Sequence, residues 1–146
     1  AGRETSQGVI EAYIHTGGKI GVLLEMMCET DFVARTEAFK ELSHDIAMQI
    51  AATDPLCNSR ESIPADVLER EKGIYEAQCR EEGKPDKIIP KIVEGKIERY
   101  YESVCLLDQP FVKDQDKKVS DIISEKMAET GENIKIGRFV RYVLGQ

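Results

Sequence analysis

The chain is 146 residues long, 41% of its residues are hydrophobic, and its formal net charge is −7. This length and apolar content are typical of one folded domain with its own core. The acidic balance argues against a nucleic-acid partner, which would be held by clustered Lys and Arg, and no apolar run is long enough to span a bilayer.

Four cysteines and two histidines are the residues that could carry redox, metal or nucleophilic chemistry. The cysteines, at positions 28, 57, 79 and 105, form no CxxC pair and have no histidine at metal-ligand spacing, which favours reduced structural thiols. His15 and His44 have no Ser or Cys beside them in a nucleophile motif. The sequence therefore predicts no active site, no bound metal and no cofactor.

The chain opens with two alternating runs. In residues 9–15 the even positions, Ile10, Ala12 and Ile14, form a fully apolar face and the odd positions a mixed one, as in a strand lying on helices. Gly17 and Gly18 can adopt the positive φ of a tight turn. From residue 20 the next run places four apolar side chains on one side: Ile20, Val22, Leu24 and Met26. These runs predict an antiparallel hairpin.

Residues 28–35 mark the change from a strand pattern to a helical one. Thr36 is the predicted N-cap of a helix from about 37 to 52. Its apolar stripe should bury against the hairpin and consists of Phe39, Leu42, Ile46 and Ile50. Phe32 would precede the regular helix. Because it lies seven residues before Phe39, a second interpretation stays open, in which the Phe32 ring shares that face and belongs to the core.

Residues 62–105 are predicted to form an antiparallel helical hairpin that protrudes from the core. Ser62 is the expected N-cap of the first arm and Gly83 its C′ residue. The second arm should start or kink near Pro90. Only a narrow apolar seam joins the arms, formed by Val67, Leu68, Ile74 and Tyr75 in the first and Ile89, Val93, Ile97, Tyr100 and Val104 in the second.

The last third returns to the core. A short helix from about 120 to 130 should end at Gly131, and a strand should follow from Ile134 to Leu144. Gly137 interrupts the alternation, which predicts a bulge and a strand buried on both sides. The expected fold is α+β: one domain over residues 1–146, with a three-stranded antiparallel sheet backed by helices and a protruding helical hairpin.

The run from residue 25 to residue 35, which contains Thr30-Asp31-Phe32-Val33, resembles the signature of elongation factor Ts, the bacterial and organellar nucleotide exchange factor for elongation factor Tu. Further stretches resemble landmarks of this family in the family's order, and together they cover nearly the whole chain: residues 6–10, 13–15, 19–23, 44–52, 82–85, 109–112 and 131–134.

The resemblance implies a protein that is not an enzyme. Such a factor promotes GDP release from elongation factor Tu during translation by binding the nucleotide-poor form more tightly, and this linkage needs no acid, base or nucleophile. It also implies which residues contact elongation factor Tu. Asp31 and Phe32 match the family's contact pair within the motif Thr30–Val33, Ile20 and Gly21 resemble a second contact pair, and Gln49 stands where some members carry a contacting His.

The resemblance further implies a homodimer joined through the sheet, since short family members hold one core and pair. In such a dimer the corner at Thr30–Phe32 of one subunit and contact positions of the other would form one bipartite surface. The alternative is a non-catalytic homodimerisation or scaffold domain without exchange activity. The compartment would be the bacterial cytoplasm, or the plastid stroma for an organellar member.

Besides Gln49 in place of His, two further departures from the family pattern bear on these expectations. Gly137 replaces a basic residue common in the last strand, which could alter the sheet edge. The family's amino-terminal helical module does not precede the core, and residues 1–4 form neither a signal peptide nor an initiator-methionine start. We therefore expect a fragment of a longer chain.

Overall fold

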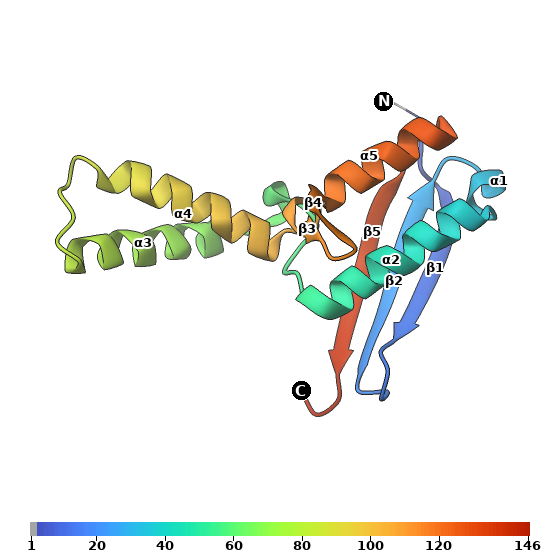
Figure 1. Cartoon of the computed structure of the whole chain (residues 1–146), viewed down its shortest axis with the longest axis horizontal. Helices are drawn as coiled ribbons and strands as arrows, with labels where there is room; N and C mark the ends of the chain where they lie inside the picture. The colour runs from blue at the N-terminus through green and yellow to red at the C-terminus, as the bar shows by residue number, and fades with distance from the viewer. Residues whose placement is uncertain (1–2) are drawn as a thin grey trace. The chain divides into compact units, whose positions relative to one another are not determined.

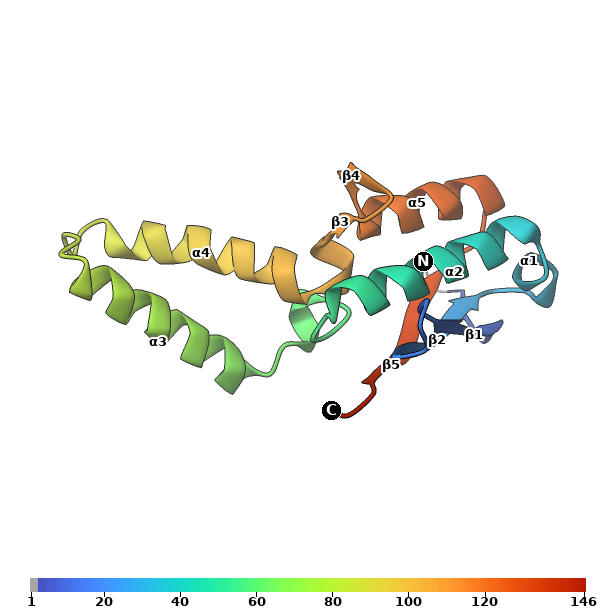
Figure 2. The same ribbon diagram turned by 60° about the horizontal axis from the view of Figure 1, so that its bottom comes forward.

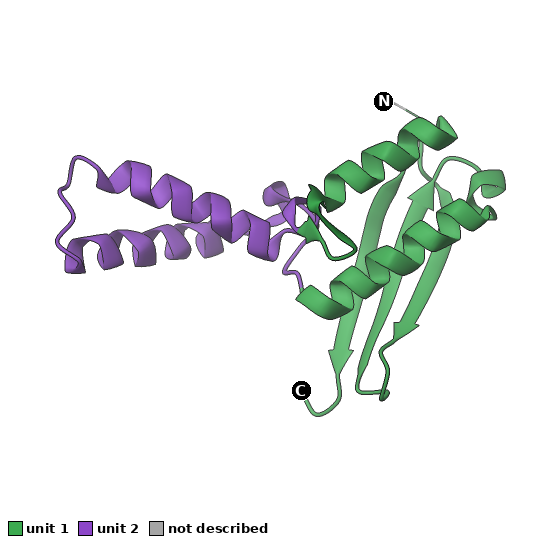
Figure 3. Cartoon of the chain, viewed as in Figure 1, with its two compact units in different colours: residues 1–54, 110–146 green, residues 55–109 purple. Residues whose placement is uncertain are grey.

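A computed structural model describes residues 3–146 and divides the chain into two compact units (Figure 3). One unit combines Ala1–Asp54 with Pro110–Gln146, and the other is Pro55–Gln109. Ala1 and Gly2, on which part of the fragment expectation rests, lie outside the described residues.

The first unit is built on a three-stranded antiparallel sheet in the order β1-β2-β5, from Gln7–Ile14, Ile20–Cys28 and Lys135–Val143 (Figure 1). Gly17 and Gly18 make the β1–β2 turn with φ of 96° and 72°, as predicted. The register of β2 against β5 shifts between Leu24 and Met26, which confirms the predicted bulge.

The helices α2 (Glu37–Thr53) and α5 (Val119–Thr130) lie on the same side of this sheet (Figures 1 and 2). Thr36 caps α2 as predicted, with its hydroxyl accepting from the Phe39 amide at 3.2 Å. Gly131 ends α5 with a φ of 72°. The predicted stripe of α2 and the inner positions of β2 form the core: Phe39, Leu42, Ile46 and Ile50 with Val22, Leu24, Met26 and Cys28.

Two predictions about burial are wrong. The fully apolar face of β1 points away from the helices, so that Ile10 and Ile14 are 64% and 67% exposed. The mixed face turns inward because it is paired with the inner face of β2. Met26 and Val22 face the core, and the register pairs Val9 with Met26 and Tyr13 with Val22. The strand β5 is also buried on one side only. Its register against β2 pairs Tyr142 with Gly21 on the outer face, where Tyr142 is 70% exposed.

One element of this unit has no counterpart in the sequence-based expectations. Residues Pro110–Phe111 (β3) and Asp114–Lys118 (β4) precede α5 in the chain and pair as a small second sheet. β4 reads Asp-Gln-Asp-Lys-Lys and has no apolar alternation to reveal it.

The second unit contains the predicted antiparallel helix pair, α3 (Ala65–Glu81) and α4 (Ile89–Val104). Gly83 closes α3 with a φ of 76°, and Pro90 lies in the first turn of α4, as expected. Ser62 is not the cap, because it ends a short 3-10 turn, Arg60–Ser62, and Pro64 takes the N-cap position. Ile74 lies outside the seam at 43% exposure, while Cys79 is buried in it with Ile89, Val93 and Ile97.

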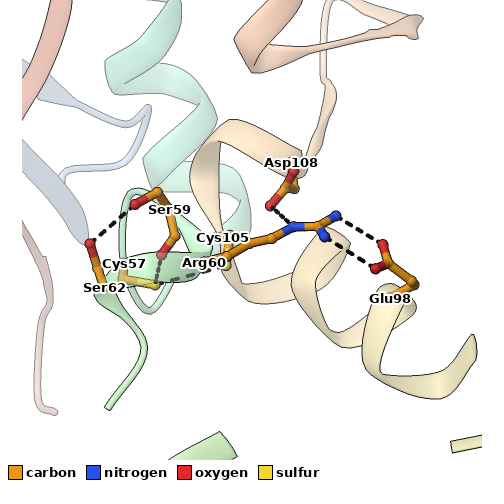
Figure 4. A network of polar contacts seen from close by, with 7 residues as sticks. All are labelled: Cys57, Ser59, Arg60, Ser62, Glu98, Cys105 and Asp108. Atoms are coloured by element: carbon orange, nitrogen blue, oxygen red, sulfur yellow. Dashed lines mark hydrogen bonds and ion pairs between the residues drawn. The ribbon is translucent and has the colours of Figure 1, made fainter. Parts of the chain in front are cut away.

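A polar network centred on Arg60 ties the start of this unit to α4 (Figure 4). The guanidinium pairs with both carboxylate oxygens of Glu98 at 2.9 and 3.1 Å and with Asp108 Oδ2 at 3.1 Å. It also lies 4.4 Å from the centroid of the Tyr101 ring. The network fastens the hairpin at its base.

Two of the four free thiols meet beside this network, with the sulfur atoms of Cys57 and Cys105 3.9 Å apart (Figure 4). Burial raises the pKa of Cys105 to about 12 and also raises that of Cys57. Both sulfurs are therefore protonated near neutral pH, in keeping with the structural role that the sequence predicts.

Candidate functional site

The stretch that the sequence singled out forms a separate turn of helix, α1 (Asp31–Ala34), directly after β2. Thr30 is its N-cap and accepts a hydrogen bond from the Val33 amide at 3.2 Å. Val33 and Ala34 are buried and anchor the turn, while the Asp31 carboxylate pairs with Arg35 at 2.7 Å. The motif therefore folds as one capped turn with its apolar side held by the core.

Phe32 lies on the outer side of this turn and is 80% exposed. Phe39, seven residues later, is completely buried, so the interpretation of Phe32 as a core residue is wrong. The shared face would require one continuous helix, whereas α1 ends at Ala34 and Thr36 starts α2 anew. An aromatic ring exposed to this extent has an apolar surface free to contact another protein.

Two glutamates to which the sequence assigned no role hold the backbone on either side of this turn. The Glu132 carboxylate accepts from the amides of Glu29 and Thr30, both at 3.1 Å, and from the Thr30 hydroxyl at 2.6 Å. In return the Glu29 carboxylate accepts from the Asn133 amide. The only sequence signal for Glu132 is its place in the stretch 131–134, which resembles a family landmark.

Ile20 and Gly21 lie at the opposite end of β2, beside the hairpin turn (Figure 1). Seven residue steps from Gly21 to Cys28 span about 23 Å in a strand. Gly21 lies on the outer face of the sheet, and a Cβ added there would come within 2.9 Å of the Ile14 side chain. Within one chain, these two residues are not brought together with Asp31 and Phe32.

Gln49, expected to contact the partner, has no exposed surface. Its amide nitrogen donates to the Pro110 carbonyl at 3.1 Å and its amide oxygen accepts from the Val112 amide at 2.8 Å. The side chain thus fastens the β3 segment to α2. Direct contact with a partner would require it to leave the core, so Gln49 does not belong to the surface formed by Phe32.

The outer face of the sheet carries a second feature, a continuous group of exposed apolar side chains from all three strands and the residue after β5. We call it the outer apolar face, and it comprises Ile10, Ile14, Leu23, Val140, Tyr142 and Leu144. These side chains are 38–71% exposed. Soluble monomers rarely leave so many apolar side chains together in water, which marks this face as an interaction surface.

One ion pair lies on the same face, at the bulge. Arg138 donates from its guanidinium to both oxygens of Glu25, at 2.9 and 2.8 Å, and its amide also donates to Glu25 at 2.8 Å. These bonds hold the pKa of Glu25 at about 2, well below its ordinary value. Gly137 leaves the room for this pair, because a Cβ there would come within 2.8 Å of Glu25 Oε1.

Among residues 3–146, no three His, Cys, Asp or Glu side chains are grouped in a way that could hold a metal ion. No helix in this range is both long and apolar enough to cross a membrane. What the described residues do present is an exposed ring on a braced turn and an apolar sheet face. The fold and site therefore define a protein-binding module.

The sequence model of the family described as Elongation factor TS matches residues 2–146. The chain is 56% identical to elongation factor Ts of Thermotoga petrophila over all 146 residues, which are 72% of that relative's length. It is also 56% identical to those of Syntrophomonas wolfei and Geobacter metallireducens, covering 68% of each.

The chain belongs to the elongation factor Ts family, the nucleotide exchange factors for elongation factor Tu. The resemblance found in the sequence is thereby confirmed, and the protein is a non-catalytic exchange factor that binds elongation factor Tu, not an enzyme. The family's activity also decides against the alternative of a scaffold domain without exchange activity.

Proposed function

We propose that Asp31 and Phe32 are the residues through which this chain contacts elongation factor Tu, with Thr30 and Val33 holding the turn that presents them. The observation that carries the proposal is the 80% exposure of Phe32 on a turn whose Val33 is buried. An aromatic side chain with this exposure loses its contact with water only when a partner covers it, and buried aromatic anchors are typical of the few residues that dominate binding energy.

Exchange then follows from linkage. A factor that binds the nucleotide-poor partner more tightly than the GDP-bound partner lowers the affinity for GDP by the same factor. GDP release accelerates to the extent that this coupling is already expressed in the transition state for dissociation. The exposed ring and the Asp31 carboxylate would supply the differential contact, and no proton transfer or covalent step is needed.

The proposal is tested by the release rate of a fluorescent GDP analogue from elongation factor Tu as the factor is titrated. Phe32→Ala and Asp31→Ala should each weaken stimulation, and loss of a dominant contact of at least about 2 kcal/mol corresponds to a roughly 30-fold or greater loss of release rate at sub-saturating factor. Ile74→Ala is the matched control, since Ile74 is also an exposed apolar side chain, on α3. Full activity of Phe32→Ala would refute the assignment.

We also propose that two copies of this chain pair through the outer apolar face. A symmetric dimer uses the same patch on both subunits, and two sheets packed face to face would remove these side chains from water. With the two-fold axis across the strands, the Ile20–Gly21 end of one subunit would lie over the Phe32 end of the other. Such a pairing would join Ile20 and Gly21 with Phe32 in one bipartite contact surface, which a single chain does not achieve.

Light scattering tests the dimer, because one chain has a mass of 16.4 kDa and the dimer twice that. Leu23→Asp places a charge on the central strand of the outer apolar face and should yield the monomer mass. Leu56→Asp is the control, an exposed apolar position of the second unit. A wild-type protein that has the monomer mass at micromolar concentration contradicts the proposal.

The similarity to bacterial proteins further leads us to infer that the factor works in the bacterial cytoplasm. Fractionation of cells that carry the natural gene, with detection of the factor by antibody, tests this inference. Recovery of the factor outside the cytoplasmic fraction would contradict it.

A further inference from the structure

We propose that Glu132 is a positioning residue for nucleotide exchange, which acts by holding α1 in the orientation that presents Phe32. The inference rests on the proposed contact role of Phe32. Glu132 itself lies on the connection between α5 and β5 and reaches the motif across more than a hundred residues of sequence.

The contacts of Glu132 with the motif, which we call the brace, act on the N-cap of α1. Thr30 Oγ1 accepts from the Val33 amide at 3.2 Å and donates its proton to Glu132 Oε2 at 2.6 Å. The carboxylate thereby fixes the rotamer in which the hydroxyl can cap α1. Its other oxygen accepts from the amides of Glu29 and Thr30, so the backbone entering the turn is fixed by the same group.

A reciprocal set of contacts keeps Glu132 itself in place. Gly131, in the left-handed conformation, ends α5 immediately before Glu132. The Glu29 carboxylate accepts from the Asn133 amide and pairs with Arg3 at 3.2 Å, and Arg3 donates to the Gly131 carbonyl at 3.3 Å. The two segments therefore hold each other through their carboxylates.

The ring cannot orient itself, which is why the brace bears on function. Phe32 is 80% exposed and α1 has only four residues, too few for a helical turn to persist by its own hydrogen bonds. Val33 and Ala34 anchor the inner side of the turn, but the hydrogen bonds at its start come from Thr30 and Glu132. Loss of Glu132 should spread the turn over several orientations, of which only some bind.

The test compares complete titrations of fluorescent-GDP release by Glu132→Ala and by its control, Glu129→Ala. Glu129 lies in the last turn of α5, pairs along its own helix with Lys126 at 3.0 Å, and carries the same charge. If about a tenth of the Glu132→Ala molecules hold the binding orientation, the half-saturating concentration rises about tenfold while the plateau rate is kept. Glu132→Gln keeps an acceptor for the two amides, so its half-saturating concentration should lie between those of Glu132→Ala and Glu129→Ala.

A double-mutant cycle distinguishes positioning of Phe32 from an independent effect. In the Phe32→Ala background, Glu132→Ala should cost much less than in the wild type, because the ring is gone and only the Asp31 contact is left to position. An equal loss in both backgrounds overturns the inference. So does an unchanged titration of Glu132→Ala when Phe32→Ala is impaired. An unimpaired Phe32→Ala instead refutes the contact role proposed above, so the two failures are distinguishable.

Stability is followed by the melting temperature, and all rates are taken well below it. If Glu132→Ala does not fold, Thr30→Val replaces it in the cycle, since valine removes the capping hydroxyl and its bond to Glu132 at nearly constant shape. Thr30→Ser retains the hydroxyl and should raise the half-saturating concentration less than Thr30→Val does. Equal titrations for Thr30→Val and Thr30→Ser would overturn the inference.

Discussion

Replacing Gln49 by alanine should destabilise the fold and leave the exchange surface intact. The side chain is completely buried, and its amide bonds the Pro110 carbonyl at 3.1 Å and the Val112 amide at 2.8 Å. The substitution removes both bonds and leaves a cavity between α2 and the β3 segment.

The size of the stability loss depends on the two backbone groups that lose their partner, the Pro110 carbonyl and the Val112 amide. A buried donor or acceptor that loses its partner costs about 1–3 kcal/mol. Pro110 is exposed enough for water to replace part of its bond, and the half-buried Val112 amide is less accessible. Adding a cavity term, we expect a loss of about 2–4 kcal/mol. For a chain of this size each kcal/mol lowers Tm by about 2–4 °C, so Tm should fall by about 5–15 °C.

Thermal unfolding and fluorescent-GDP release are measured on the same preparations. Gln49→Met keeps most of the volume and isolates the lost hydrogen bonds, while Glu41→Ala is an exposed control on the same helix. Below its Tm, Gln49→Ala should half-saturate at the wild-type concentration. An unchanged Tm together with a raised half-saturating concentration would refute the reasoning and restore Gln49 as a partner contact.

Three further perturbations test the described geometry. Glu25→Gln should lower stability at neutral pH, because Arg138 depresses the pKa of Glu25 from 4.5 to about 2. The stability contributed by the ionised Glu25 carboxylate is fully present above pH 4.5 and is lost as pH falls towards 2. The free energies of unfolding in urea of variant and wild type should therefore converge in acid, and a difference that stays constant with pH contradicts the prediction. Gly8→Ala should strongly destabilise the β1–β2 pair, since its Cβ would lie 1.9 Å from the Met26 carbonyl oxygen at a φ of 146°, and a wild-type Tm contradicts this. Phe39→Ala should cost about 3–5 kcal/mol in denaturant unfolding and Phe32→Ala less than about 1 kcal/mol, because only the first ring is buried; equal losses would place both rings in the core.

Local rules were enough to predict most elements of this protein, although not β3, β4 or the separate turn α1. The paired glycines of the first turn, the Thr36 cap, Gly83 and Gly131 all act within a few residues of themselves, and each lies where the pattern predicts. The motif Thr30–Val33 and the further landmarks were sufficient to recognise the family, because such stretches can be read without knowing the fold.

Tertiary structure alone decided the burial of several other residues. The alternation of side chains shows that β1 has an apolar and a mixed face, but not which of them is buried. Pairing with β2 places the mixed face against the core and leaves Ile10 and Ile14 exposed. Spacing along the chain could not separate Phe32 from Phe39, since an interval of seven residues has meaning only within one unbroken helix. Gln49 is buried where it bonds Pro110 of the β3 segment, 61 residues away in the sequence. Glu132 bonds Thr30, 102 residues away in the sequence. Contacts at such separations depend on how the elements pack, which no local pattern encodes.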